Sequence, residues 1–433
     1  MKTEYIIKEC DYFYREGDNK SDNKRAYALP KEIFDTLENF VLENKEEDDD
    51  EYSEFLYLKQ KKGYGKILKA KNYVGVIQTD QGITIEILPK LYCSENEENI
   101  RKILLEMLKS LKESPFKKIN LANLHTHKFD LFDIFINMFL EELSKLIKNG
   151  IKRGYIPKKE NSNFFRGKLL INKHINNNFI HKERFFVKYE EFTTDRPENR
   201  LIKSTLNVLR EKTNSRHLQK NLNQYLFIFD NVGFSKNYES DFSKCRYNRK
   251  MKDYQLLLEW CSIFLKEKSF LSQKGQNIAY SLLFPMERIF EDYVAYSIKR
   301  HKMFFDFDIE VQEKNYSLFD IPERFYLKPD IVLKKDKQKI LIDTKWKILD
   351  EESSNYGISQ SDMYQMYAYA KKYNADKIVL VYPYSKKTKN ILKKDDDLCF
   401  ISYEEDKNVE INIFFIKLDQ IDKTLSELFN KII

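Results

Sequence analysis

The chain has 433 residues, of which 42 % are hydrophobic and 33 % charged, a composition typical of a folded soluble protein with an ample core. Its length predicts two or three domains. The formal net charge of +7 is mildly basic, which is compatible with nucleic-acid binding but does not by itself indicate it. The first residues lack the apolar core of a signal peptide, and no apolar run is long enough to span a bilayer. We therefore expect a cytoplasmic protein without a membrane segment.

The 5 cysteines are far apart in the sequence, which excludes the zinc-ribbon and thioredoxin-type spacings. Their number is odd, and we interpret them as reduced thiols, as is usual in the cytosol.

Residues 1–115 are predicted to form a β-rich domain. Two runs of β-formers within residues 71–92 flank a Thr-Asp-Gln-Gly turn, and the second run alternates with period two, so a hairpin is expected. The basic, glycine-containing segment 59–71 is interpreted as a turn between strands; the alternative is a loop that contacts a partner.

Residues 116–270 are predicted to form a mostly helical middle domain. An amphipathic helix is expected to end at Gly150, which suits a C-cap. A second helix follows the Thr-Asp-Arg-Pro turn, with Asp195 as a plausible N-cap and Pro197 at the first helical position. Asn199 and Arg200 are expected to organise that turn.

A basic run within residues 244–252 interleaves cations with tyrosine. Four of its residues are candidate contacts to a DNA backbone: Arg246, Arg249, Lys250 and Lys252. A solvated helix face fits the same pattern equally well.

Residues 271–433 alternate between strands and helices, which predicts a mixed sheet flanked by helices. The whole chain is therefore expected to be a mixed, multi-domain α/β protein.

The segment 327–347, LKPDIVLKKDKQKILIDTKWK, carries the strongest chemical signal. Two apolar runs joined by a short polar turn predict a hairpin, which would bring Asp330 at the start of one strand close to Asp343 at the end of the next. Asp343 and Lys345 are two residues apart and share one face of a strand. Thr344 points to the other face and is expected to contribute at most a backbone carbonyl.

Two carboxylates and a lysine at one place suit phosphodiester hydrolysis. Mg²⁺ prefers oxygen ligands, and it typically uses one or two protein carboxylates and retains several waters. A bound metal lowers the pKa of water and stabilises charge on a phosphate. Lys345 is expected to orient or deprotonate the attacking water, or to stabilise the oxyanion.

The neighbouring helices add further polar groups. Glu287 and Glu291 lie four residues apart on the helix before the hairpin, and either one is a candidate third metal ligand, with Glu291 preferred. Gln365 and Tyr369 have the same spacing on the following helix and are expected to position a phosphate or a metal-binding acid.

In this order, Glu291, Asp330, Asp343, Lys345 and the Gln365–Tyr369 pair resemble the site of the PD-(D/E)xK nuclease superfamily. More narrowly, the chain resembles the McrC family, the nuclease subunits of McrBC-type restriction systems, from about residue 70 onward. The motifs that carry this resemblance are EILPKL (86–91), FRGKL (165–169), DRPENRLIKSTL (195–206), MERIFEDYV (286–294), LKPDIVL (327–333), DTKWK (343–347) and YQMYAYAKKY (364–373).

The resemblance implies a Mg²⁺-dependent endonuclease subunit that cleaves modified, methylated DNA. It implies an McrB-like AAA+ GTPase partner, whose GTP hydrolysis this chain stimulates through its N-terminal part. The chain lacks the G-x-x-x-x-G-K-[ST] loop, so GTP is expected to bind to the partner. The partner is expected to recognise the modified base, and this chain to contact only the backbone of double-stranded DNA. A homodimer would supply two sites for a double-strand break.

Two other functions fit the sequence. One is a nuclease that works alone or with a different motor in repair or phage defence. The other is a non-catalytic activator that bridges AAA+ rings, and the intact Asp330, Asp343 and Lys345 argue against it.

Overall fold

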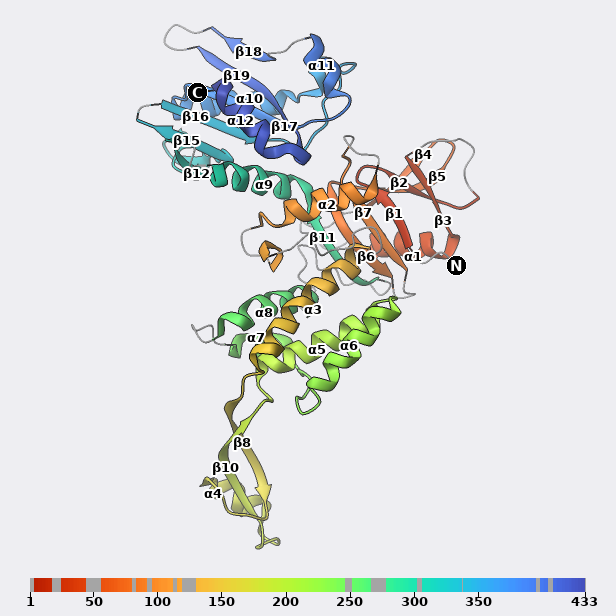
Figure 1. The fold of residues 1–433 in the computed structure, drawn as a ribbon, viewed down its shortest axis with the longest axis vertical. Helices are drawn as coiled ribbons and strands as arrows, with labels where there is room; N and C mark the ends of the chain where they lie inside the picture. The colour runs from red at the N-terminus through yellow and green to blue at the C-terminus, as the bar shows by residue number, and fades with distance from the viewer. Residues whose placement is uncertain are drawn as a thin grey trace. The chain divides into compact units, whose positions relative to one another are not determined.

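The computed structural model divides the chain into two compact units, Met1–Lys128 with Gln273–Ile433, and Phe129–Ser272. Each unit is considered by itself (Figure 1). The structure describes residues 4–17, 25–43, 56–79, 83–91, 96–111, 115–118, 130–245, 251–265, 278–301, 306–336, 338–394, 398–403 and 408–432.

The N-terminal part of the first unit consists of two four-stranded sheets, ordered β3-β2-β5-β4 and β1-β7-β6-β11. Its elements are β1 (Glu4–Lys8), β2 (Tyr12–Arg15), β3 (Ala26–Leu29), α1 (Lys31–Glu43), β4 (Leu56–Lys61), β5 (Gly65–Ala70), β6 (Tyr73–Thr79), β7 (Thr84–Leu88), α2 (Glu97–Leu108) and the 3₁₀ helix η1 (Pro115–Lys118).

The expected hairpin in residues 71–92 is confirmed, because β6 and β7 pair antiparallel. The period-two alternation of β7 does not produce a solvent-facing side, since all five of its residues are buried. Glu86 is tolerated there because Arg101 on α2 donates to both of its carboxylate oxygens, at 2.8 and 2.6 Å. The segment 59–71 is mostly strand, and β4 and β5 pair on either side of a short turn. The interpretation of this segment as a turn between strands is confirmed.

Strand β11 (Ile278–Pro285) pairs antiparallel with β6 and so belongs to the N-terminal sheet, although the sequence places it in the third domain. The helix α9 (Met286–Arg300) follows β11 directly. One continuous strand–helix segment therefore connects the N-terminal sheet to the C-terminal domain.

The C-terminal domain is built on a six-stranded mixed sheet, ordered β12-β15-β16-β17-β19-β18. Strands β16, β17 and β19 are parallel, and the remaining neighbours in this sheet pair antiparallel. After α9, the elements are β12 (Asp308–Val311), β13 (Ser317–Asp320), β14 (Glu323–Tyr326), β15 (Ile331–Lys335), β16 (Gln338–Thr344), η5 (Ser354–Gly357), α10 (Gln360–Tyr373), β17 (Lys377–Pro383), α11 (Thr388–Lys394), β18 (Cys399–Ser402), β19 (Val409–Ile416), η6 (Leu418–Gln420) and α12 (Ile421–Ile432).

Helices pack on this sheet, and the buried side chains between the helices and the sheet form the core of the domain. Met366, Tyr369 and Tyr373 on α10 pack into one buried cluster with alternate residues of β15, β16, β17 and β19. Helix α9 contacts β16, and α12 contacts β19 and α9. The mixed α/β architecture expected from the alternating sequence pattern is confirmed.

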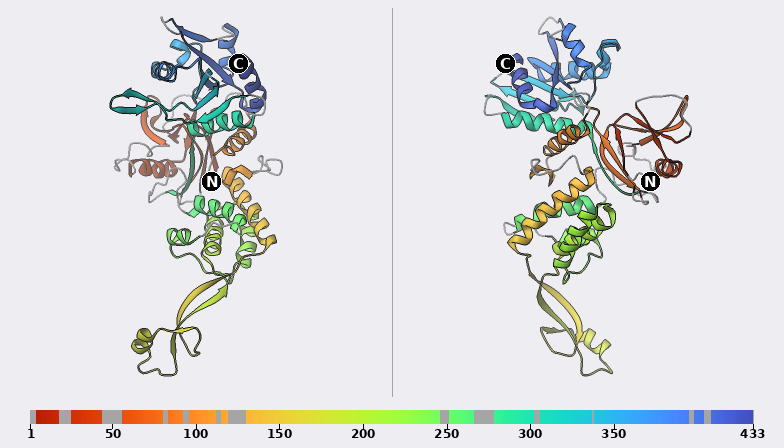
Figure 2. Two further views of the ribbon diagram at one scale, coloured as in Figure 1. Left: turned by 90° about the vertical axis from the view of Figure 1, so that its left-hand side faces the viewer. Right: turned by 45° about the vertical axis from the view of Figure 1, so that its right-hand side comes forward.

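The second unit is a group of helices from which a long β-hairpin projects (Figure 2). The hairpin strands β8 and β10 pair over nine residues, and β9 extends the sheet. The elements are α3 (Leu131–Asn149), β8 (Gly154–Ser162), β9 (Lys168–Leu169), α4 (Ile171–Asn177), β10 (Phe185–Thr193), α5 (Pro197–Lys212), α6 (Arg216–Ile228), α7 (Tyr238–Lys244) and α8 (Lys252–Leu265). Among the helices that the structure describes, none has the length and apolar character to cross a bilayer.

The helix ends in this unit follow the sequence signals with one exception. Gly150 is the C-cap of α3 with φ 89°, and Pro197 begins α5, both as expected. The assignment of Asp195 as N-cap was wrong. Arg196 occupies that position, and the Asp195 carboxylate instead accepts two hydrogen bonds from Arg200, at 2.7 and 2.6 Å. The bidentate ion pair is available because Arg200 lies one helical turn beyond Arg196.

Asn199 organises the turn before α5, as expected. Its side-chain amide donates to the carbonyls of Lys152 at 3.1 Å and Thr194 at 2.7 Å, and its oxygen accepts from the Tyr254 hydroxyl at 2.9 Å. The side chain is fully buried. It therefore connects the hairpin base, the turn and α8 through three hydrogen bonds.

Asn199→Ala is expected to lower the free energy of unfolding by about 2–3 kcal/mol, because it leaves buried carbonyl and hydroxyl groups without partners. Chemical denaturation measures this change. Asn207→Ala is the matched control, since Asn207 lies on the same helix and bonds to Glu211 at the surface. Equal losses in the two variants would contradict the role given to Asn199.

Candidate active site

The β15–β16 hairpin brings Asp330 and Asp343 to one end of the six-stranded sheet. The register pairs Ile331 with Ile342 and closes at Lys335 and Gln338. Asp330 therefore precedes the first paired residue of one strand, and Asp343 follows its partner on the other. The sequence-based expectation that the hairpin brings these two residues together is confirmed.

Thr344 fastens Asp330 in place. Its backbone N–H and its hydroxyl both donate to Asp330 Oδ2, each at 2.7 Å. The expectation that Thr344 offers at most a carbonyl was wrong. The β16 strand ends at this residue, so its N–H has no strand partner on that side and is available to the carboxylate.

Lys345 connects Asp343 to helix α10. Its ammonium lies 2.7 Å from Asp343 Oδ2 and donates to Gln365 Oε1 at 3.2 Å. Gln365 in turn donates to the Tyr369 hydroxyl at 2.7 Å. The Gln365–Tyr369 pair therefore holds the lysine in position, and the helical spacing of four residues is what aligns the two side chains.

The two glutamates of α9 have different surroundings. Glu291 accepts a hydrogen bond from Gln312, and its charge acts on both Asp330 and Asp343. Glu287 is exposed and accepts from Asn72 of the N-terminal part at 3.1 Å. Glu291 is therefore the glutamate of α9 whose charge acts on the two aspartates.

The site holds more negative charge than its burial favours. Burial raises the pKa of Asp330 to about 8, and the charges of Asp343 and Glu291 add to this effect. Burial likewise raises the pKa of Asp343, despite the opposing charge of Lys345. Both shifts express the cost of ionised carboxylates in a poorly solvated place, and a cation would relieve that cost.

The donor atoms are oxygens, and oxygen is the element that a hard divalent cation such as Mg²⁺ prefers as a ligand. The two aspartates supply carboxylate oxygens, and Asp343 Oδ2 is a buried atom that accepts no well-aligned hydrogen bond within the described residues, although the Lys345 ammonium is near. Across the described ranges, no group of three or more carboxylate, histidine or cysteine side chains is spaced to bind a metal ion. The fit therefore rests on the aspartate pair.

Two residues of the site have no place in the sequence-based predictions. They are Gln312 and Asp362, whose charge acts on Asp343 and Lys345. Asp362 carries a signal that could have found it, since it lies three residues before Gln365 on the same helix. Gln312 follows β12 in a loop, and no local pattern identifies it.

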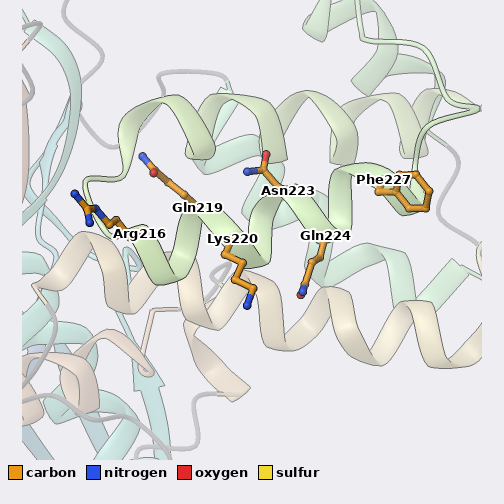
Figure 3. A pocket seen from close by; sticks show the side chains of 6 residues that line it. All are labelled: Arg216, Gln219, Lys220, Asn223, Gln224 and Phe227. Atoms are coloured by element: carbon orange, nitrogen blue, oxygen red, sulfur yellow. The ribbon is translucent and has the colours of Figure 1, made fainter.

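The candidate DNA contacts of the middle domain are only partly described. Arg246, Arg249 and Lys250 lie outside the described residues, and Lys252 is the exposed first residue of α8. A surface hollow of about 710 Å³ runs along α6 (Figure 3). It is lined by Arg216, Gln219, Lys220, Asn223, Gln224 and Phe227. None of these residues is acidic, so the hollow offers no carboxylate for metal-dependent hydrolysis.

The β8–β10 hairpin, with α4 and the segments that connect its strands, exposes 8 large apolar side chains. Phe179 and Ile180 are 81 % and 84 % exposed. The others are Tyr155, Phe164, Phe165, Ile171, Ile175 and Phe192. Apolar patches of this kind mark interaction surfaces more often than ordinary solvent-facing surface.

The family model for the McrBC 5-methylcytosine restriction system component matches residues 68–383. The chain belongs to this family. The match includes the whole β15–β16 hairpin and α10. No curated protein matches the chain.

One solved McrBC structure supports a similar fold for this chain. In a refined half-complex from a tetradecameric assembly of Thermococcus gammatolerans McrB AAA+ hexamers with bound McrC, one chain matches with a TM-score of 0.68 and 20 % sequence identity, covering 100 % of both chains. A chain of the cryo-EM structure of the Thermococcus gammatolerans McrBC complex matches with a TM-score of 0.47 and 19 % identity, covering 69 % of this chain and 88 % of that chain. The first match also covers the first 70 residues, for which the sequence offered no resemblance.

The acid pair predicts an unusual pH dependence. Because the pKa of Asp330 is raised from 3.8 to about 8, the folded protein binds a proton that the unfolded chain has released between these pH values. The free energy of unfolding of the metal-free protein therefore falls as pH rises through this window. Asp330→Asn removes this loss, and we expect its melting temperature in EDTA to exceed that of the wild type by several degrees at pH 9 and by little at pH 5. A change of 1 kcal/mol corresponds to roughly 2–4 °C.

Asp350→Asn is the matched control, because Asp350 is a surface acid with a lowered pKa that results from its bond to Lys387. It should show no stabilisation that grows with pH. A difference between Asp330→Asn and the wild type that is the same at pH 5 and pH 9 would mean that Asp330 titrates near its ordinary value.

Proposed function

We propose that this chain is the Mg²⁺-dependent DNA endonuclease subunit of a McrBC-like, GTP-dependent restriction system that cleaves methylated DNA. The observation that carries the proposal is the convergence of Asp330, Asp343 and Lys345 at one sheet end, in a member of the McrBC component family. The order of elements around this site, with Glu291 before it and Gln365 after it, agrees with the PD-(D/E)xK pattern.

Asp330 and Asp343 would hold the metal ion, and Glu291 is a third acid whose charge acts on both of them. A bound Mg²⁺ would supply a water of lowered pKa and stabilise charge on the scissile phosphate. Both hydrogen bonds from Thr344 go to Asp330 Oδ2 and not to Oδ1, and they fix the orientation of the carboxylate. The protein's contribution is thus a preorganised pair of oxygen donors.

Lys345 is suited to stabilise charge and not to remove a proton. Although burial lowers the pKa of its ammonium, the charges of Asp343, Asp330 and Asp362 outweigh this and raise the pKa overall. The side chain is therefore a fixed cation at neutral pH, of the kind that stabilises the charge developing on a phosphate in the transition state. Gln365 keeps it directed toward the acids.

The partner in this proposal is an McrB-like AAA+ GTPase, which binds GTP and whose hydrolysis this chain stimulates. The exposed apolar side chains of the β8–β10 hairpin support a docking role for that element. The segment 59–71 remains a second candidate contact. The DNA is double-stranded and contacted through its backbone, Lys252 being the described candidate of the basic run. Cleavage of both DNA strands requires two nuclease sites and therefore two copies of this chain. A restriction system of this kind acts in the cytoplasm as a defence against foreign DNA.

Asp343→Ala is expected to reduce cleavage of methylated plasmid by about 100-fold or more, because it removes a metal-binding oxygen pair. The assay contains Mg²⁺, GTP and an McrB-like GTPase, and it records DNA cleavage and GTP turnover in the same tubes. Stimulated GTP turnover should persist. Asp350→Ala is the control for an acid of the same domain outside the site, and it should cut normally.

The outcomes separate the competing functions. If Asp343→Ala still cuts, the β16 end is structural and the site is misassigned. If neither protein cuts but both stimulate GTP hydrolysis, the chain is a non-catalytic activator. If the wild type cuts without the GTPase, it is a nuclease that works alone.

A further inference from the structure

Glu9 is a buried carboxylate that follows β1 in the N-terminal sheet. Its Oε1 accepts hydrogen bonds from the Lys90 backbone N–H at 3.0 Å and from the Trp346 indole N–H at 2.6 Å. Oε2 is buried and has no hydrogen-bond partner in the described part of the chain, and the Lys90 ammonium is 4.0 Å away. A carboxylate is thus kept in a costly position, and the bond to Trp346 is its contact with the C-terminal domain.

Trp346 follows Lys345 directly and is the second residue after Thr344. Its ring is buried and packs on Phe290 with ring centroids 5.2 Å apart. Phe290 precedes Glu291 on α9. One indole therefore contacts the N-terminal sheet through its N–H and, through its ring, the helix that carries the acidic residue of the site.

A second connection joins α9 to the same N-terminal part. The Met286 N–H donates to the Asn72 carbonyl at 2.8 Å, and the Asn72 side chain donates to Glu287 at 3.1 Å. The preceding strand β11 is paired along its length with β6. The start of α9 is therefore fixed to the N-terminal sheet independently of Trp346.

We propose that Glu9 is a positioning residue for the nuclease site and acts through Trp346 on Lys345 and α9. The proposal rests on the proposed function, since it concerns the geometry of that same site. The β16 strand ends at Thr344, and although the Lys345 N–H still donates to the Val381 carbonyl of β17 at 2.9 Å, the Lys345 side chain depends on its own contacts for its place. Beyond that backbone bond, the Glu9–Trp346 bond keeps the chain from rotating about the strand end.

A purely structural role would have a different signature. A bond that only joins two domains changes stability, whereas a bond that positions Lys345 changes the rate of the chemical step at saturating substrate. The conservative variant Glu9→Gln separates the two, because its amide oxygen still accepts from Trp346 and Lys90 although its charge is lost.

The experiment measures single-turnover cleavage of methylated DNA by the full chain with its GTPase, at a series of DNA concentrations. Glu9→Ala should lower the maximal rate by about 10-fold or more with half-saturation changed by less than about 2-fold. Glu9→Gln should retain a rate within about 3-fold of the wild type. Trp346→Phe, which keeps the ring and loses the N–H donor, should match Glu9→Ala.

The double variant Glu9→Ala with Trp346→Phe should lose no more than either single variant, because both remove the same bond. Glu86→Gln is the control for a buried carboxylate in the same sheet, whose partner is Arg101 and not the site. It should keep the wild-type rate per folded molecule. Multiplicative losses in the double variant, or a Glu9→Ala rate within 2-fold of the wild type, would overturn the proposal.

A readout without activity separates failure of this proposal from failure of the proposed function. The chain has 2 tryptophans, Trp260 and Trp346, so 5-fluorotryptophan labelling gives two ¹⁹F resonances, assigned with Trp260→Phe. In Glu9→Ala the Trp346 resonance should broaden or split while that of Trp260 stays unchanged. If the wild type does not cut DNA but this change occurs, positioning stands and the nuclease function fails. An unchanged Trp346 resonance shows that Glu9 does not hold the segment.

Discussion

The candidate site depends on the burial of two aspartates that a short hairpin holds side by side in a poorly solvated place. Among the described residues, neither Asp330 nor Asp343 has an arginine partner; Thr344 bonds to the first and Lys345 to the second. Burial raises the pKa of both carboxyl groups, and the charges of neighbouring acids add to the shift, so the site favours a bound positive charge. Lys345 supplies part of that charge, and a divalent cation is the species expected to supply the rest.

This electrostatic demand explains why the supporting contacts are polar and fixed. Lys345 donates to Gln365, which donates to Tyr369, and Tyr369 also packs into the core with Met366 and Tyr373 of the same helix. Buried polar networks of this kind stabilise a structure only when their members are satisfied. The same helix therefore supplies both the apolar packing and the orientation of the lysine.

The N-terminal part is connected to the site by a shared strand and by a side-chain hydrogen bond. Strand β11 belongs to the N-terminal sheet and leads into α9, and Glu9 reaches across to Trp346. A buried group with an unsatisfied oxygen costs about 1–3 kcal/mol. The retention of Glu9 at that cost is what distinguishes this contact from ordinary packing. In the other unit, the β8–β10 hairpin is held at its base by Asn199 while its apolar side chains face solvent.

The sequence by itself determined the local features of this protein. Period-two patterns and a short polar turn specified the β15–β16 hairpin, so Asp330 and Asp343 had to meet, and helical spacing aligned Gln365 with Tyr369. Gly150 and Pro197 marked helix ends because their backbone preferences are local. Only the tertiary structure decided which glutamate of α9 acts by its charge on the two aspartates, that Thr344 holds Asp330, and that Gln312, Glu9 and β11 belong beside residues far away in the chain. These contacts depend on long-range packing, and no periodicity in a single sequence encodes which distant side chains will share one buried place.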